Sequence, residues 1–80
     1  MMTLERAKAL QVGQTLYHLR NTNADGTAQR WRVTGKPKTW KREPERVKVP
    51  VKHGLWDYDY VTEVDLHLVS TTEPSPEDMP

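Results

Sequence analysis

The side chains best suited to bind a ligand are a run of cations around one tryptophan. No acid interrupts residues 30–42, which contain Arg30, Arg32, Lys36, Lys38, Trp40, Lys41 and Arg42. Lysine and arginine neutralise the phosphates of a nucleic acid backbone, and an exposed indole stacks on a base. We therefore take these seven residues as the candidate nucleic-acid-binding site.

The charge of the chain is divided along its length. Residues 30–53 contain nine Lys and Arg but only two acids, Glu43 and Glu45, whereas residues 54–80 contain seven acids and no Lys or Arg. The formal net charge of +1 conceals this division. It indicates either a basic binding surface or basic and acidic strands that fold against each other.

The sequence gives little support to catalysis or to metal binding. The chain has no cysteine and only two serines, so nucleophile and base arrangements have few starting points. Its three histidines fall on separate predicted elements and lack the spacing of a metal site; they are His18, His53 and His67. We predict a non-enzymatic protein without a metal or another cofactor.

Asp57 and Asp59 are two residues apart and superficially resemble a catalytic carboxylate pair. Lys48 lies opposite Asp59 in the strand pairing predicted below. We therefore interpret these carboxylates as partners in surface ion pairs, which contribute little to stability.

Size and composition indicate one small domain. The chain has 80 residues, no Phe, and no apolar run near the roughly 20 residues that a membrane-spanning helix needs. Glu5, Arg6 and Lys8 interrupt any signal-peptide-like apolar stretch at the N-terminus. We expect a cytoplasmic protein that does not enter a membrane.

The first part of the chain predicts a short helix and two strands. Residues 1–11 form a short helical segment with Thr3 as its N-cap. Residues 14–20 and 28–34 alternate as strands do, and a turn over 21–27 connects them. In the second strand Trp31 alternates with Arg30 and Arg32, and we expect it in the core.

Residues 46–52 and 55–61 predict a hairpin with His53-Gly54 as a two-residue loop. In this register the valines of one strand face the aromatic residues of the other: Val51 faces Trp56, Val49 faces Tyr58 and Val47 faces Tyr60. Trp56 is therefore expected in the core. Trp40 has no strand partner, and whether it is exposed stays open, as does the choice for 35–45 between an extension of the second strand and a basic loop.

The remaining segments complete a five-stranded, all-β fold. Residues 62–65 predict a helical turn and 66–69 a last strand, whereas the acidic, Pro-rich segment 70–80 predicts a disordered tail. This order of elements resembles an SH3-like barrel over residues 12–69, with an OB-like barrel as the alternative. The run KTWKREPERVKVPVKHGLWDYDYVTE also resembles stretches in small uncharacterised proteins of phages and mobile elements, which implies no activity.

These observations predict a binding module whose partner is nucleic acid. The alternative is a protein-interaction module, in which Trp40 and nearby prolines bind a peptide or an acidic surface of a host protein. A strand edge at Pro50 would allow a dimer as well as a monomer. The acidic tail could also fold back on residues 30–42 and compete with a ligand.

Overall fold

A computed structural model describes residues 2–75 as a mostly β protein with one short helix. Six strands occur where five were predicted. The elements in chain order are α1 (Leu4–Lys8), β1 (Thr15–Thr22), β2 (Ala28–Val33), β3 (Lys38–Trp40), β4 (Glu43–His53), β5 (Asp57–Thr62), the 3-10 helix η1 (Glu63–Leu68) and β6 (Val69–Ser70).

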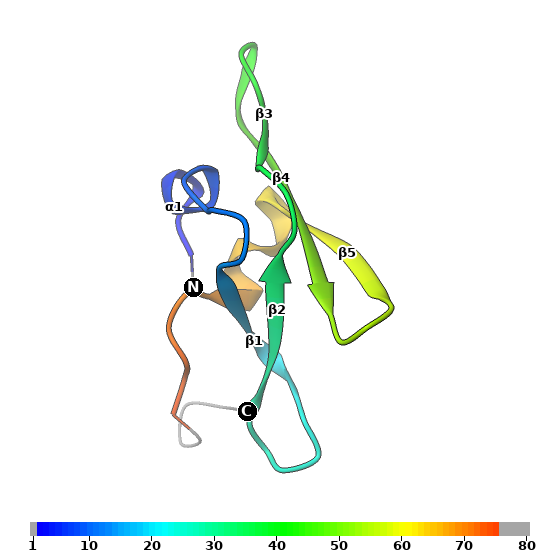
Figure 1. Cartoon of the computed structure of the whole chain (residues 1–80). Helices are drawn as coiled ribbons and strands as arrows, with labels where there is room; N and C mark the ends of the chain where they lie inside the picture. Colours follow the sequence, from blue (N-terminus) through cyan, green and yellow to red (C-terminus); the bar gives the residue numbers. More distant parts are fainter. Residues whose placement is uncertain (1, 76–80) are drawn as a thin grey trace.

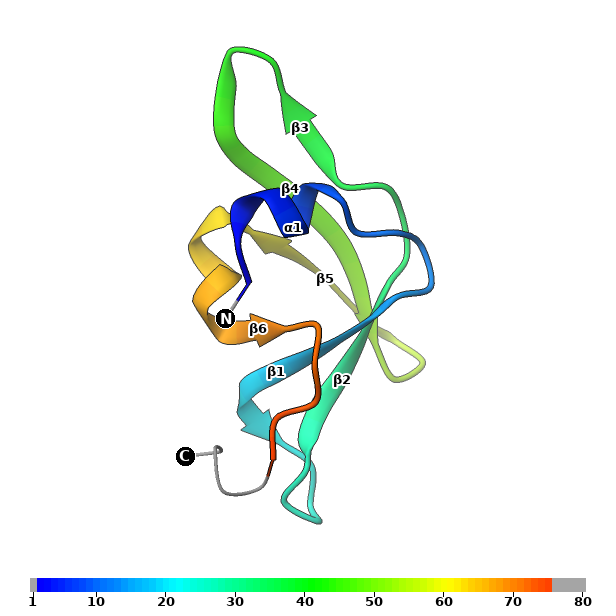
Figure 2. The same cartoon turned by 90° about the vertical axis from the view of Figure 1, so that its left-hand side faces the viewer.

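The strands form one antiparallel sheet in the order β3-β4-β2-β1-β6, and β5 also pairs with β4. Within residues 2–75 no ladder joins β5 to β6, so the sheet is not closed. The fold is therefore all-β as predicted, but it is an open sheet around a small core (Figures 1 and 2).

Strand β4 organises the sheet because three other strands, β2, β3 and β5, pair with it. Pro50 lies between the end of its ladder with β3, at Lys48, and the start of its ladder with β2, at Val51. The Pro50 carbonyl accepts a hydrogen bond from the Thr34 N–H at 2.9 Å, just beyond the end of β2. A proline is tolerated here because its missing N–H faces a gap between two partner strands.

The core is made of small aliphatic side chains from nearly every element. It contains Met2, Ala7, Leu10, Leu16, Val33, Val47, Val49, Val51, Val61 and Val69, with Leu4, Trp31 and Leu66 packed against it. Helix α1 covers one part of this core, and its predicted cap is confirmed: Thr3 Oγ1 accepts the Arg6 N–H at 3.2 Å. Trp31 is half-buried against the core rather than inside it.

The predicted register of the β4–β5 hairpin is wrong. The turn has three residues, Gly54–Trp56, and Gly54 adopts a φ of 66°. Val49 pairs with Val61, whereas Val51 pairs with Asp59. This shift by an odd number of residues exchanges the two faces of β5, because side chains alternate along a strand.

The exchange moves the aromatic residues out of the core. Trp56 is 85% exposed, Tyr58 67% and Tyr60 52%, so the prediction of a buried Trp56 is also wrong. The physical reason is the position of Val61. Val61 lies on the same face of β5 as Asp59. Because Val61 is buried against Val49, Tyr58 and Tyr60 on the opposite face of β5 point outward.

Residues 35–45 form neither an extension of β2 nor a loop. They supply β3 and the start of β4, which turn at Lys41 and Arg42 into a hairpin that we call the arm. The arm extends away from the rest of the sheet, at the top of Figures 1 and 2. The Lys8 ammonium donates a hydrogen bond to the Pro44 carbonyl and so links the helix to the arm.

The end of the chain differs in length from its prediction. The helical turn is longer, Glu63–Leu68, and the last strand is shorter, Val69–Ser70. Residues 71–75 have no regular secondary structure, and the rest of the predicted disordered tail lies outside the described residues. Among residues 2–75 no helix has the length and apolar character needed to cross a bilayer.

Candidate functional site

The structure divides the seven predicted site residues between the sheet and the arm. Arg30 and Arg32 lie on β2, whereas the other five follow β2 in the connection to β3 or belong to the arm. All six cations are exposed: Arg30, Arg32, Lys36, Lys38, Lys41 and Arg42. The predicted segment is therefore accessible, but it does not form one compact cluster.

Strand pairing extends the basic surface beyond the predicted segment. Partner residues in a ladder share one side of the sheet, and Arg32 pairs with Lys52, while Lys38 pairs with Lys48. We call the side opposite the buried valines the outer face. By register its members are Thr15, Tyr17, Arg30, Arg32, Lys38, Lys48, Pro50, Lys52, Tyr58, Tyr60 and Thr62.

None of the outer-face residues is acidic. Asp59 pairs with Val51 and so belongs to the other side of the sheet, which overturns the predicted ion pair between Asp59 and Lys48. Within residues 2–75 the ion pairs involve Arg46, whose guanidinium lies 2.8 Å from Glu43 and 3.9 Å from Glu63. Apart from Arg46, which shares the phase of Lys48 on β4, the cations of the outer face thus form no ion pair with carboxylates of residues 2–75.

The lysines of β4 lie over tyrosine rings instead. The Nζ atom of Lys48 is 4.1 Å from the ring centroid of Tyr60, and that of Lys52 is 5.2 Å from the centroid of Tyr58. Exposed cation–π contacts of this kind contribute about 0.5–1 kcal/mol each. They hold the ammonium groups in place and leave their charge available to an anion.

Trp40 is a surface residue of the arm with cations over its ring. The guanidinium carbon of Arg46 lies 4.0 Å and the Nζ atom of Lys38 5.3 Å from the indole centroid. The Glu43 carboxylate accepts a hydrogen bond from Arg46 and thereby raises the pKa of Arg46 above its ordinary value. Whether Trp40 is exposed was left open by the sequence. Its indole is half-buried, so it is neither fully exposed nor fully buried.

A shallow depression of about 560 Å³ lies where β1, β2 and the β4–β5 turn meet. Three cations contribute to its wall, and the turn closes one end. Its lining is Thr15, Arg30, Trp31, Arg32, Lys52, Gly54 and Leu55. Such a concave, positively charged surface concentrates anions at the sheet.

The sequence interpretation missed Lys48, Lys52, Tyr58 and Tyr60 as surface residues of one site. It placed Lys48 opposite Asp59 and both tyrosines opposite the valines of the neighbouring strand. The available signal was Val61, which alternates with the tyrosines. If that valine is buried, Tyr58 and Tyr60 must face the other way.

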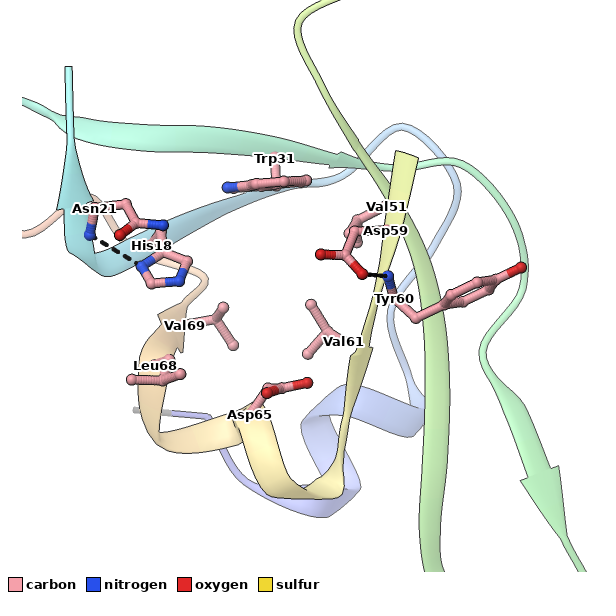
Figure 3. Close-up of a pocket in the computed structure, with 10 residues that line it drawn as sticks. All are labelled: His18, Asn21, Trp31, Val51, Asp59, Tyr60, Val61, Asp65, Leu68 and Val69. Atoms are coloured by element: carbon pink, nitrogen blue, oxygen red, sulfur yellow. Dashed lines mark hydrogen bonds between the residues drawn. The ribbon is translucent and has the colours of Figure 1, made fainter. Parts of the chain in front are cut away.

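A second cavity, of about 270 Å³, lies at the open side of the sheet between β5, β1 and the end of η1 (Figure 3). Its polar lining includes two carboxylates and no Lys or Arg. Asp65 accepts hydrogen bonds from the Thr62 N–H at 3.0 Å and its hydroxyl at 3.2 Å, and Asp59 accepts the Tyr60 N–H at 2.7 Å. These two carboxylates thus lie on the side opposite the basic outer face.

His18 lines this cavity and is held in its neutral form. Its Nδ1 atom accepts the backbone N–H groups of Arg20 at 3.1 Å and Asn21 at 3.0 Å, so Nδ1 carries no proton (Figure 3). Burial lowers the pKa of His18 below its ordinary value, and the nearby Asp65 charge opposes this shift in part. In the described part of the chain, no three His, Asp or Glu side chains are grouped to hold a metal ion.

No protein-family model, curated protein or solved structure matches this chain. The outer face and the arm, by their geometry and charge, are therefore the features that indicate a function.

Proposed function

We propose that this protein is a non-enzymatic module that binds nucleic acid through its outer face and its arm. One observation carries the proposal. Arg30, Arg32, Lys48 and Lys52 share a face that has no acidic residue, and no carboxylate of residues 2–75 pairs with them. A phosphate backbone supplies the missing negative charge and releases its counterions on binding.

The two parts of the site have different tasks in this proposal. The depression beside Arg30, Arg32 and Lys52 receives phosphates at the sheet. Lys36, Lys38, Lys41 and Arg42 continue the positive surface onto the arm, and Trp40 adds an aromatic contact. The longest dimension of the molecule is 42 Å, which gives room for several consecutive phosphates.

We also propose that the open sheet is a variant of the SH3-like barrel, over residues 12–69. The support is the order of elements: a long hairpin follows the second strand, and a 3-10 helix precedes the last one. The resemblance to small phage proteins and a cytoplasmic location belong to the same proposal, and the lack of cysteine suits a reducing compartment.

A protein partner is the second candidate. The exposed side chains of Leu55, Trp56, Tyr58 and Tyr60 favour it, because aromatic side chains are enriched among interface hot spots. Salt distinguishes the two candidates. Phosphate binding weakens linearly with the logarithm of salt concentration, whereas an apolar, aromatic-anchored interface responds little.

Fluorescence anisotropy with labelled DNA and RNA over a series of salt concentrations tests the proposal. The triple variant Lys38→Gln, Lys41→Gln and Arg42→Gln should lower the log–log salt slope by about 2 to 3, since each lost phosphate contact contributes roughly 0.7–0.9. Trp40→Ala should weaken binding while the domain stays folded. Arg6→Gln, which removes an exposed cation from α1, is the matched control and should change neither quantity.

Two results would count against the proposal. Absence of binding to every nucleic acid at low salt would direct the search to protein partners. Equal losses in the triple variant and in Arg6→Gln would mean that net charge, and not the arm, determines the affinity.

A further inference from the structure

Three of the six aromatic residues of this chain lie in one exposed row. Trp56 is in the β4–β5 turn, and Tyr58 and Tyr60 follow it on alternate positions of β5, all more than half exposed. A domain this small has few aromatic side chains with which to build a core. Leaving half of them in water indicates that the row contacts a partner.

The spacing of the row suits separated bases. Alternate residues on a strand lie about 7 Å apart, so the side chains of Tyr58 and Tyr60 form steps of that height along β5. A duplex stacks its bases about 3.4 Å apart and keeps their faces inside the helix. A single strand can spread its bases and place each one against a separate ring.

The charges beside the row fit the same ligand. The Nζ atom of Lys48 lies 4.1 Å from the Tyr60 centroid and that of Lys52 lies 5.2 Å from the Tyr58 centroid, so each tyrosine of the row has a cation next to it. Arg32 continues this positive charge, since it pairs with Lys52 on the neighbouring strand. Alternating rings and cations match alternating bases and phosphates, whereas a purely apolar peptide would leave the cations without partners.

We propose that the ligand is single-stranded nucleic acid, with its bases on Trp56, Tyr58 and Tyr60 and its phosphates on Lys48 and Lys52. This inference rests on the proposed function and names its substrate class. The ammonium groups leave the ring faces at small cost, because exposed cation–π contacts are weak. Each base then takes the ring surface that the ammonium group vacates.

The test compares three labelled probes of equal length: an oligothymidylate, the same sugar–phosphate strand without bases, and a duplex. Because the first two carry the same charge, their difference reports base contacts alone. We expect the oligothymidylate to bind at least about tenfold more tightly than the abasic strand, as base–aromatic stacking predicts. The duplex should bind more weakly than the oligothymidylate, although it carries more phosphates.

Variants assign this difference to the row. Tyr58→Ala and Tyr60→Ala should each weaken oligothymidylate binding by about tenfold, with an unchanged salt slope and unchanged abasic binding. Tyr58→Phe keeps the ring and should bind as the parent does. Val64→Ala, which shortens an exposed apolar side chain on η1, is the control for nonspecific loss.

The outcomes separate the two proposals. If all three probes bind with a salt slope but the abasic strand and the duplex bind as tightly as the oligothymidylate, phosphate binding stands and this inference is overturned. Normal oligothymidylate binding by both alanine variants would overturn it as well. If no probe binds at low salt, the proposed function fails, and this inference fails with it.

Discussion

The replacement Trp56→Ala tests the register on which both proposals depend. Trp56 is 85% exposed, so only about 40 Å² of the roughly 250 Å² of a tryptophan side chain is removed from water. At about 25 cal/mol per Å², the replacement should lower the free energy of unfolding by at most about 1 kcal/mol. A two-residue hairpin loop would instead put Trp56 against Val51 in the core, where the same replacement costs about 3–5 kcal/mol.

Urea unfolding followed by far-ultraviolet circular dichroism measures this difference without relying on tryptophan fluorescence. Val49→Ala is the matched comparison, because Val49 is fully buried and pairs with Val61 at the centre of the hairpin. Val49→Ala should lower the free energy of unfolding by about 2 kcal/mol, because it removes two buried methyl groups and leaves a cavity. If Trp56→Ala destabilises the protein more than Val49→Ala does, the three-residue turn and the exposed aromatic row are both refuted.

Two further predictions concern the hairpin and pH. The double variant Lys52→Cys with Tyr58→Cys should form a disulfide on oxidation, because these residues are direct partners and the chain has no other cysteine. The double variant Val51→Cys with Trp56→Cys should not form one. Mobility on non-reducing gels reports which pair is bonded. His18 should make stability fall as pH drops, because its pKa in the folded protein lies below its ordinary value of 6.5. The contribution of His18 to the free energy of unfolding is complete above about pH 6.5 and is lost as pH decreases through the lower folded pKa. The urea midpoint should therefore decrease between neutral and mildly acidic pH, and an equal decrease in His18→Asn would exclude His18 as the cause.

Local signals in the sequence were sufficient for most of the elements. Thr3 marked the start of α1, alternation marked β1 and β2, and the helical turn before the last strand was found at Thr62, although its end was not. The pairing of residues 46–52 with the following strand was also predicted. Each of these features depends on residues close together in the chain, where propensity and periodicity are informative.

The hairpin register could not be obtained from the same signals. Valine–aromatic pairs favour a two-residue loop, and the tertiary core overrides them by requiring Val61 beside Val49. The arm was missed for a related reason. Its short strand β3 has little apolar periodicity of its own and exists because it pairs with β4.

The register also explains why the chain carries opposed blocks of charge. In the predicted pairing Lys48 would have met Asp59, and basic and acidic strands would have neutralised each other across the hairpin. In the structure the same two side chains lie on opposite sides of the sheet, because Asp59 pairs with Val51. The lysines therefore keep their charge on the outer face, while Asp59 lies with Asp65 beside the cavity that His18 lines.

This separation gives the two sides of the sheet different charge, which the net charge of +1 does not reveal. In the proposed function an approaching polyanion meets Arg32, Lys48 and Lys52 first, because the positive outer face attracts it. The shift that exposes Tyr58 and Tyr60 also keeps Asp59 away from the lysines. The exposed tyrosine rings and the lysines without carboxylate partners thus both result from the packing of Val61 against Val49. A variant that restored the predicted register would lose both features together.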